Sequence, residues 1–244
     1  MRVVEVSETA SLGATLHAPL LADPSGFRLD RAAKRAFDLT LSLLLLVCLA
    51  PLFIVCVAAI AAESRGPVFF RCRRVGLNGK DLYVLKFRKM RHGELGPSLT
   101  EPLDARFTRL GPLLAKTKLD ELPQLWSVLK GDMSIVGPRP EDEEFVRLHG
   151  ADYDAILSVR PGITGLSQLA FASESRVLDP SDRIGHYVKR ILPQKAAIDL
   201  MYVERRTMSF DLRILFWTVL PVILRRDVAV NRTSGALTLR RRAH

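Results

Sequence analysis

The sequence is poor in cysteine and histidine, which excludes two common ways of holding a small domain together. Its three cysteines, Cys48, Cys56 and Cys72, are odd in number, and none of them lies in a C-x-x-C pair. A disulfide framework needs a dense, even set, so we expect a reduced chain that faces the cytoplasm. Its five histidines are scattered along the chain, which argues against a zinc site. There is also no internal repeat and no low-complexity tract.

Negative charge is scarce as well. The chain has 26 Asp and Glu against 36 Lys and Arg, a formal net charge of +10. An excess of this size indicates anionic partners, which are phosphates, nucleic acid or an acidic lipid surface. At 244 residues the chain has room for one domain with a sizeable core. Its apolar fraction of 48% and charged fraction of 25% exclude a disordered polymer and a polytopic membrane protein.

The longest apolar run covers residues 37–62 and carries one charge, Asp38, near its start. As one straight helix it would measure about 39 Å, enough to cross a hydrocarbon core of about 30 Å. Pro51, however, lies almost at its midpoint, where it removes a backbone donor and clashes with the preceding turn. Cations flank both ends: Arg28, Arg31, Lys34 and Arg35 before the run, and Arg65, Arg71, Arg73 and Arg74 after it.

Lys and Arg near an apolar segment favour the cytoplasmic side. Equal clusters at both ends favour a re-entrant helix that breaks at Pro51 and returns to the same face of the membrane. A Pro-kinked spanning helix remains the alternative, because prolines are tolerated in such helices.

A β-hairpin is expected at residues 68–88. Two β-prone stretches there flank Asn78-Gly79, the strongest short hairpin signal. Two roles are open for the basic Lys86 and Arg88 on the second strand: a solvated face near anionic headgroups, or binding of a phosphate.

Besides the apolar run and the segment that begins at Asp120, three helices are expected. The first covers residues 104–116 and places Arg106 and Arg109 on one side. The second covers residues 184–206. The third, at 214–224, is too short to span a membrane, and its pattern fits an interfacial helix and a buried core helix equally well.

Asp120 and Glu121 are expected to begin a helix that ends near Gly131, because apolar residues recur between them at helical spacing. Asp120 would then lie at the N-cap or in the first turn, where the helix dipole stabilises negative charge. That purely structural role is one interpretation. The other is chemical, since two adjacent carboxylates among cations suit a divalent metal ion or a nucleophile.

Two stiff basic turns are also expected. Arg139 is locked between Pro138 and Pro140, so its guanidinium loses less entropy when it meets a phosphate. Residues 160–165 offer a second turn, which begins with Arg160 and contains two glycines that would let the backbone approach a ligand. For the turn at Arg139, a rigid turn with an exposed arginine is the alternative.

Together these segments resemble the bacterial sugar transferases, specifically the small monotopic phosphoglycosyl transferases that start glycan assembly on polyprenyl phosphate. The resemblance runs from about residue 34 to residue 226. Its blocks come in the family order: Lys34-Arg35-x-x-Asp38, Gly66-Pro67-Val68-Phe69-Phe70, Lys86-Phe87-Arg88-x-Met90, Leu119-Asp120-Glu121-Leu122-Pro123-Gln124, Met133-Ser134-Ile135-Val136-Gly137-Pro138-Arg139-Pro140 and Arg160-Pro161-Gly162-Ile163-Thr164-Gly165. A single block would be weak evidence, whereas the ordered set is specific.

The resemblance implies an α+β fold, mostly helical, in which a compact catalytic domain with a small β-hairpin hangs on one Pro-broken re-entrant helix. It implies transfer of a sugar 1-phosphate from a UDP-sugar to undecaprenyl phosphate, with release of UMP and use of Mg²⁺. It makes Asp120 the nucleophile and associates Glu121 with the site and its metal ion. Expected substrate-binding residues are Lys86, Arg88, Arg109, Pro138, Arg139, Pro140 and Arg160. The expected location is the bacterial inner membrane, with the catalytic domain in the cytoplasm.

The expected organisation has four parts: a flexible tail at 1–27, the membrane helix region at 28–65, the catalytic domain at 66–230 and a basic tail at 231–244. The four extra N-terminal membrane helices of larger family members are not expected. One departure from the family concerns the helix break, where Ala50 precedes the proline in place of the common serine.

A competing hypothesis is a non-catalytic scaffold whose basic face binds anionic lipid. A nucleic-acid-binding module would rest on net charge alone, since no recognition motif supports it. The sequence names neither the sugar nor the oligomeric state. Exopolysaccharide or capsule synthesis is the expected pathway, on family frequency.

Overall fold

The computed structural model describes residues 24–93, 104–172, 178–179, 181–224, 228–231 and 234–239. Most of the predicted N-terminal tail and the last five residues lie outside this part. The helices are α1 (Pro24–Cys48), α2 (Ala50–Glu63), α3 (Gly111–Thr117), α4 (Gln124–Lys130), α5 (Glu143–Leu148), α6 (Gly150–Ile156), α7 (Leu166–Ala170), α9 (Arg183–His186), α10 (Leu192–Arg205) and α11 (Met208–Leu224). The strands are β1 (Phe69–Val75), β2 (Asp81–Phe87), β3 (Ser134–Val136), β4 (Gly162–Thr164), β5 (Val228–Val230) and β6 (Leu237–Leu239). This is the mixed α+β composition that the resemblance implies.

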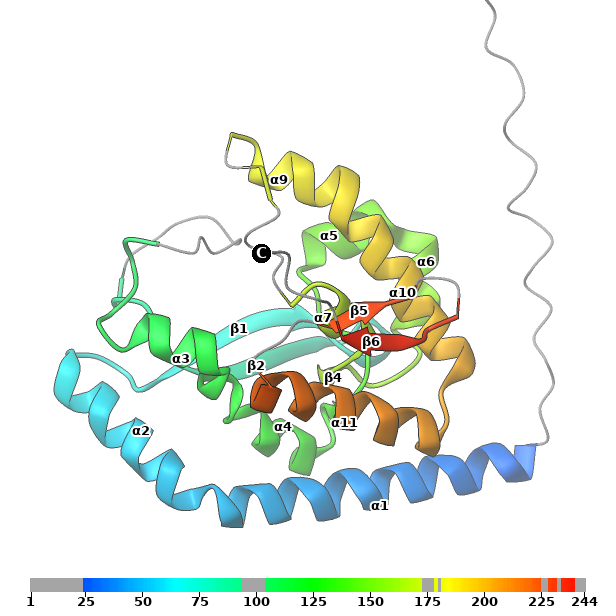
Figure 1. Ribbon diagram of the computed structural model, residues 1–244, viewed down its shortest axis with the longest axis horizontal. Helices are drawn as coiled ribbons and strands as arrows, with labels where there is room; N and C mark the ends of the chain where they lie inside the picture. The colour runs from blue at the N-terminus through cyan, green and yellow to red at the C-terminus, as the bar shows by residue number, and fades with distance from the viewer. Residues whose placement is uncertain are drawn as a thin grey trace, which may run out of the picture.

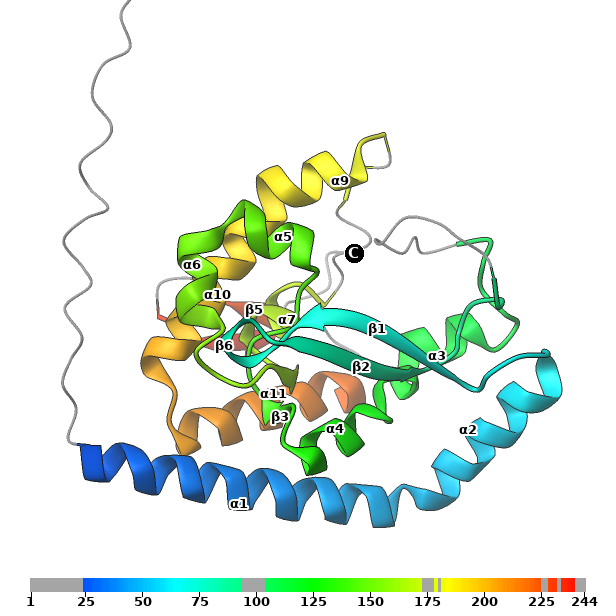
Figure 2. The ribbon, with the colours of Figure 1, turned by 180° about the vertical axis from the view of Figure 1, so that it is seen from behind.

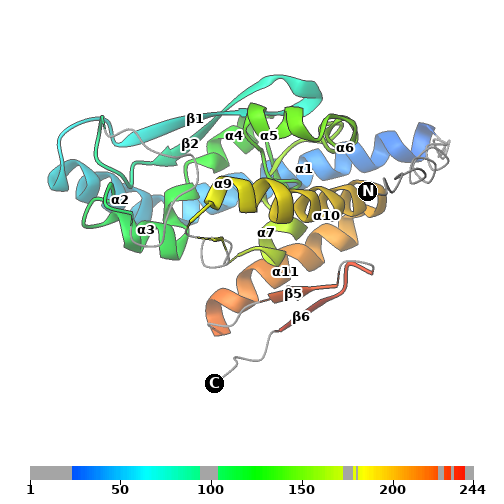
Figure 3. The same ribbon diagram turned by 90° about the horizontal axis from the view of Figure 1, so that it is seen from above.

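The long helix α1 runs along one edge of the molecule, and α2 continues from its end at an angle (Figure 1). Above α1 lie α4 and α11, and farther from it lie α5, α6 and α10. The hairpin β1–β2 crosses the other face of the molecule (Figure 2). Seen from above, this hairpin and the pair β5–β6 lie at opposite edges, with α7 and α10 between them (Figure 3).

The break expected in the apolar run is present. The helices Arg31–Cys48 and Ala50–Glu63 meet at an angle of 61°, and Pro51 lies in the first turn of α2, where its missing N–H is not needed. Within the described residues no single helix has the length and apolar character to cross a membrane, whereas this bent pair does by those two measures. Its position relative to a membrane stays a prediction.

Polar contacts fasten α1 to the rest of the domain. Asp38 is 2% exposed, and its carboxylate accepts hydrogen bonds from Ser134 Oγ (2.8 Å) and the Ile135 amide (3.1 Å) of β3. Lys34 Nζ lies 3.0 Å from that carboxylate. Arg35 donates to the carbonyls of Val128 (2.6 Å) and Leu129, close to the end of α4. A buried carboxylate needs such partners, so these contacts determine how the helix lies on the domain.

The predicted hairpin is confirmed. β1 pairs antiparallel with β2, and the connection carries Asn78 and Gly79 at φ of 55° and 74°. Asn and Gly adopt this left-handed conformation more readily than other residues, which is why the pair predicts the turn.

The second predicted turn, at residues 160–165, is instead a strand. Gly162–Thr164 forms β4, which pairs in parallel with β3. A Cβ on Gly162 would lie 2.1 Å from the Gly137 nitrogen, and one on Gly165 would lie 2.1 Å from the Gly137 carbonyl oxygen. These glycines therefore allow close approach to the backbone of Gly137, whereas the sequence suggested approach to a ligand.

The helix predicted at 104–116 begins later, at Gly111, with Pro112 in its first turn. The preceding residues form a turn and pair with the chain after β2: the Thr108 amide donates to Lys89 O, and Met90 forms a β-bridge with Phe107. Arg106 forms an ion pair with Asp104. Residues 107 and 108 pair with the chain after β2 and do not continue the helix that their spacing predicted. Arg109 therefore lies outside the helix.

The C-terminal helices behave as predicted in part. Residues 183–205 form α9, a π-helical turn at 187–191 and α10. Helix α11 has one face in the core and one exposed apolar face, because Ile214 is fully buried while Phe216 is 59% exposed. It therefore has features of both the buried core helix and the interfacial helix that its sequence allowed. The predicted basic tail contains β6, whose Leu237 packs in the core.

Helix α10 carries a buried acidic group, Asp199, which is 5% exposed. Burial raises the pKa of Asp199 to about 7; nearby Glu141 also raises this pKa, and Lys195 lowers it. The folded protein therefore holds a proton at Asp199 that the unfolded chain releases at lower pH. By linkage, this group lowers stability as pH rises from about 4 to about 7.

The corresponding prediction concerns Asp199→Asn, which cannot ionise. On going from about pH 5 to about pH 8, the variant should gain free energy of unfolding relative to the parent protein. Denaturant unfolding at both pH values measures this difference. The exposed Asp154→Asn on α6 serves as the control, and an Asp199→Asn difference that is constant with pH contradicts the assignment.

Candidate active site

The Asp120–Glu121 pair lies in a 3₁₀ turn, Leu119–Glu121, between α3 and α4. The sequence suggested that Asp120 begins the following helix, but α4 starts at Gln124 with Pro123 ahead of it. At the end of α3 Lys118 adopts a left-handed φ of 60°, which reverses the chain into this turn. The pair is thus positioned by a tight connection between two helices.

Asp120 is almost completely buried, with 1% of its surface exposed. One carboxylate oxygen, Oδ2, lies 2.8 Å from Lys89 Nζ. The other, Oδ1, is buried and has no hydrogen-bond partner among the described residues. A buried carboxylate oxygen without a partner is costly unless a ligand or solvent satisfies it, so Oδ1 is available for a bound group.

Glu121 lies between two cations. Its Oε1 is 3.3 Å from Lys86 Nζ and 3.3 Å from Arg139 Nη2. Burial by itself would raise the pKa of Glu121, but Arg139, Lys86 and Lys118 outweigh it and hold the pKa well below its usual range. Burial lowers the pKa of Lys86, an effect that Glu121 partly offsets. The lowered pKa means that the Glu121 carboxylate is ionised at neutral pH.

These groups come from three segments that are far apart in sequence. Lys86 and Lys89 lie at the end of β2, the carboxylates lie between α3 and α4, and Arg139 lies after β3. In Figure 2 the end of the hairpin approaches α3 and α4. The result is two carboxylates matched by three cations in a largely buried cluster, which we call the dyad cluster: Lys86, Lys89, Asp120, Glu121 and Arg139.

The Pro-Arg-Pro turn is rigidly held beside the β3–β4 pair. The Gly137 amide donates to Thr164 O (2.9 Å), and the Gly162 amide donates to Pro138 O (2.8 Å). With the flanking prolines these bonds leave the backbone little freedom, so Arg139 is presented to Glu121 from a fixed position. Of the residues predicted to bind substrate, Lys86 and Arg139 contact Glu121. Pro138 and Pro140 flank Arg139 and restrict its backbone.

Three other predicted substrate-binding residues are not part of this cluster. Arg88 is 4% exposed and donates to the carbonyls of Ser64 and Arg65, each at 2.7 Å, at the end of α2. Arg160 donates to Gly131 O. Arg109 is exposed, and in the described part of the chain no hydrogen bond or ion pair joins it to the dyad. The contacts of Arg88 indicate a structural role, as the cap of the bent helix pair.

Lys89 is the member of the cluster that the sequence did not single out. It follows Lys86 and Arg88 in one basic run, but β2 ends at Phe87, and strand alternation no longer assigns faces beyond that point. Lys118 was missed for a similar reason, because its effect on Glu121 depends on the left-handed turn at the end of α3.

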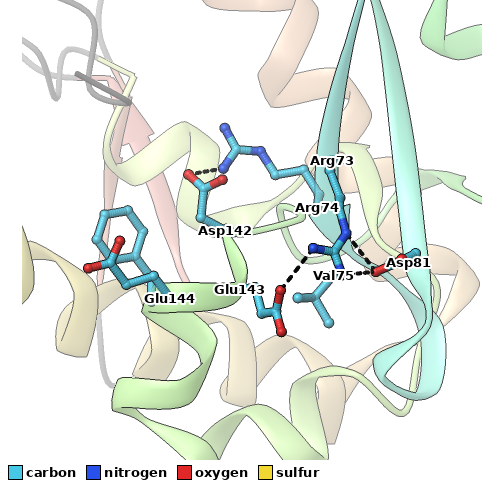
Figure 4. Close-up of a pocket in the computed structure, with 8 residues that line it drawn as sticks. Arg73, Arg74, Val75, Asp81, Asp142, Glu143 and Glu144 are labelled. Carbon is cyan, nitrogen blue, oxygen red and sulfur yellow. Dashed lines mark hydrogen bonds and ion pairs between the residues drawn. The ribbon is translucent and has the colours of Figure 1, made fainter. Parts of the chain in front are cut away.

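A separate charged pocket of about 320 Å³ lies at the other end of the hairpin. Figure 4 shows that its side chains pair with one another: Arg73 with Asp81 (2.8 Å) and Glu143 (3.1 Å), and Arg74 with Asp142. The pairs with Asp142 and Glu143 attach β1 to the start of α5, which indicates a structural contact between two elements.

An apolar groove of about 340 Å³ lies beside the bend between α1 and α2. Residues of the helices, the hairpin and the start of α4 line it: Leu46, Phe53, Phe69, Leu85, Pro123 and Trp126. Pro123 is two residues from Glu121, so the groove begins close to the dyad along the chain. Trp126 is 53% exposed within it.

Mg²⁺ is the metal ion that the resemblance implies. Within the described residues there is no group of three or more His, Cys, Asp or Glu side chains that could hold a metal ion. Mg²⁺, however, is commonly bound by one or two carboxylates together with substrate phosphates and water. Asp120 and Glu121, with the unpartnered Oδ1 of Asp120, fit that limited donor set.

The buried carboxylates and their three cations thus form a charged site next to an apolar groove, as expected of an enzyme whose substrates combine charged and apolar parts. A family model described as bacterial sugar transferase matches residues 29–225. The chain therefore belongs to the bacterial sugar transferase family.

Three relatives illustrate its similarities. The chain is 36% identical over 202 residues to a UDP-glucose:undecaprenyl-phosphate glucose-1-phosphate transferase of Xanthomonas campestris pv. campestris, covering 78% of this chain but 39% of that protein. It is 38% identical to the protein of that name from Caulobacter vibrioides, covering 80% and 71%. It is also 38% identical to the exopolysaccharide production protein PSS of Rhizobium leguminosarum bv. phaseoli, covering 81% and 98%. The chain thus spans little more than a third of the first relative and almost all of the third.

The contact between Lys89 and Asp120 can be tested by unfolding. Lys89→Met leaves the buried carboxylate without its cation and should lower the free energy of unfolding by about 1–3 kcal/mol. Adding Asp120→Asn should recover part of that loss, so a double-mutant cycle by denaturant unfolding should show coupling of about 0.5–3 kcal/mol. The exposed Lys80→Met in the hairpin turn is the control. Additive effects would show that the two side chains do not interact.

Proposed function

We propose that this protein transfers a sugar 1-phosphate from a UDP-sugar to undecaprenyl phosphate and releases UMP, as the first step of exopolysaccharide or other surface glycan synthesis. The observation that carries the proposal is the buried Asp120–Glu121 pair surrounded by Lys86, Lys89 and Arg139, in a chain of this family. The names of its relatives supply the substrates, a UDP-sugar donor and an undecaprenyl phosphate acceptor.

In the first step, Asp120 Oδ1 attacks the β-phosphorus of the donor. A new O–P bond forms, and the bond from that phosphorus to the bridging oxygen breaks. UMP leaves with the oxygen and the bonding electron pair, and the phosphosugar stays on Asp120 as an acyl phosphate. In the second step, a phosphate oxygen of the lipid attacks the same phosphorus, and Asp120 leaves as a carboxylate. This order predicts ping-pong kinetics.

A carboxylate cannot approach a diphosphate unless negative charge is neutralised first. Arg139, on its rigid turn, and Lys86 and Lys89, at the end of β2, converge on the carboxylates at distances of 2.8–3.3 Å and suit this task. Mg²⁺ held by Asp120 and Glu121 would add charge neutralisation on the phosphate oxygens. Glu121 would either help to hold that ion or accept the proton of the acceptor.

A membrane location suits such a reaction because the acceptor cannot leave the bilayer. Large apolar side chains are exposed on α1 and α2, which line the lower edge of Figure 1, and on α4 and α11, which lie above α1. They include Leu43, Leu44 and Val47 on α1, Ile54 and Val55 on α2, Trp126 on α4, and Leu212, Phe216 and Val219 on α11. Many exposed large apolar side chains on neighbouring elements are typical of a membrane or protein contact. We infer that the bent pair enters the inner membrane from the cytoplasm and returns, with α11 at the interface.

The apolar groove beside the bend supports the same substrate class. It combines an almost wholly apolar lining with a position close to Glu121, which matches a ligand with a charged head and a hydrocarbon tail. The isoprenoid chain nearest the phosphate would lie in it.

The covalent step has a direct test. Parent protein incubated with a UDP-sugar, without lipid, should release UMP in a burst and gain the mass of one phosphosugar. Asp120→Asn should lose the adduct and slow turnover with lipid by about a thousandfold or more. Asp132→Asn, an exposed acidic residue, is the control. A panel of UDP-sugars in the same assay identifies the donor.

Two outcomes contradict parts of this account. Parental turnover by Asp120→Asn would remove the nucleophile assignment. Vesicle binding without UMP release from any donor would favour the lipid-binding scaffold instead.

The topology has a separate test in a variant without native cysteines. Ala36→Cys and Ala62→Cys place exposed thiols at the two ends of the bent pair. In spheroplasts neither thiol should react with a membrane-impermeant maleimide, and both should react after permeabilisation, because both ends face the cytoplasm. Labelling of one end in intact spheroplasts would indicate a spanning helix.

A further inference from the structure

The residue after the Pro-Arg-Pro turn, Glu141, is a carboxylate that the reaction itself does not require. It is 9% exposed, and its side chain meets Lys195 of α10. Lys195 Nζ donates to Glu141 Oε1 at 2.7 Å, and the Tyr187 hydroxyl donates to the same oxygen at 2.9 Å. Lys195 also donates to that hydroxyl at 2.8 Å. The three groups form a closed, buried triangle.

The triangle is charged as well as hydrogen-bonded. Burial by itself would raise the pKa of Glu141, but Lys195, Tyr187 and Arg139 outweigh it, and the pKa lies below its usual value. A buried ionised carboxylate has lost its hydrogen bonds to water and depends on its protein partners instead. Moving it away from those partners would leave a buried charge unpaired, which is costly. Glu141 is thereby held at one place relative to α10.

The same segment is held from its other side by the hairpin. The Val75 amide of β1 donates to Glu141 O at 3.0 Å, and Arg74 forms an ion pair with the next residue, Asp142, as Figure 4 shows. This is the hairpin whose far end supplies Lys86 and Lys89. Glu141 therefore links α10 and the hairpin to the chain two residues beyond Arg139.

The ion pair between Arg139 and Glu121 is long, so its alignment depends on how firmly the turn is held. The Arg139 side chain is 33% exposed and meets Glu121 at 3.3 Å, a long distance for an ion pair that must be aligned. The Arg139 backbone is held at the start of the turn by the bonds at Gly137 and Pro138. After the turn, Pro140 leads directly to Glu141. The backbone from which the guanidinium extends is thus held at both ends of a three-residue segment.

We propose that Glu141, held by Lys195 and Tyr187, is a positioning residue that aligns Arg139 for the diphosphate of the UDP-sugar. This proposal rests on the proposed function. It adds that the Glu141–Lys195–Tyr187 triangle, outside the dyad cluster, affects binding of the UDP-sugar and not of the lipid. Glu141 and Lys195 act through Arg139 and do not touch the substrate.

The test compares steady-state kinetics of the full-length protein and its Glu141→Gln variant, which keeps the size of the side chain. The variant should raise KM for the UDP-sugar about tenfold, since loss of a supporting partner of this kind commonly costs ten- to a hundredfold. The KM for undecaprenyl phosphate should stay at the parental value. Glu144→Gln, at an exposed neighbour in the same helix, is the matched control and should leave both constants unchanged.

A double-mutant cycle with Arg139→Ala separates positioning from a general structural role. If Glu141 acts through Arg139, Glu141→Gln should cause no further rise of KM for the donor in the Arg139→Ala background. Losses that multiply would overturn the proposal, as would a parental donor KM in Glu141→Gln. Tyr187→Phe, which deletes one hydroxyl, should shift the donor KM in the same direction by about threefold and provides the measurement if Glu141→Gln fails to fold. A parent protein that releases no UMP would instead refute the proposed function.

Discussion

The structure depends on keeping two adjacent carboxylates out of water. Asp120 and Glu121 are consecutive in the chain, and both are largely buried, which is unfavourable unless cations compensate. The compensating charges come from the hairpin and from the Pro-Arg-Pro turn, so neither element can shift without exposing an unpaired charge. The positions of β2, of the α3–α4 connection and of the segment after β3 are therefore coupled through this one cluster.

Two further polar networks extend the coupling outward. Asp38, Lys34 and Arg35 attach α1 to β3 and to the end of α4, the helix that follows the dyad. On the opposite side, Glu141 and Lys195 attach the Pro-Arg-Pro turn to α10. In the proposed function these contacts hold a site for a soluble nucleotide sugar at a constant position relative to the apolar surface that faces the lipid.

Local signals in the sequence were reliable where the backbone itself imposes the conformation. Asn78-Gly79 predicted the hairpin because these residues accept positive φ, and Pro51 predicted the break because it lacks a donor. Helical spacing at 104–116 was misleading, since residues 107 and 108 pair with the chain after β2. The stiff turn expected at 160–165 became β4 for the same reason: a partner strand was available.

The sequence by itself determined the dyad, the bent apolar helices, the rigid Pro-Arg-Pro turn and, through ordered motifs, the family. These are properties of short segments, which carry their own conformational limits. The tertiary structure alone decided which cations meet the carboxylates. It placed Arg88 on the end of α2, Arg160 on Gly131 and Lys89 on Asp120. A long, flexible basic side chain can reach many acceptors, and its partner depends on contacts between segments distant in sequence.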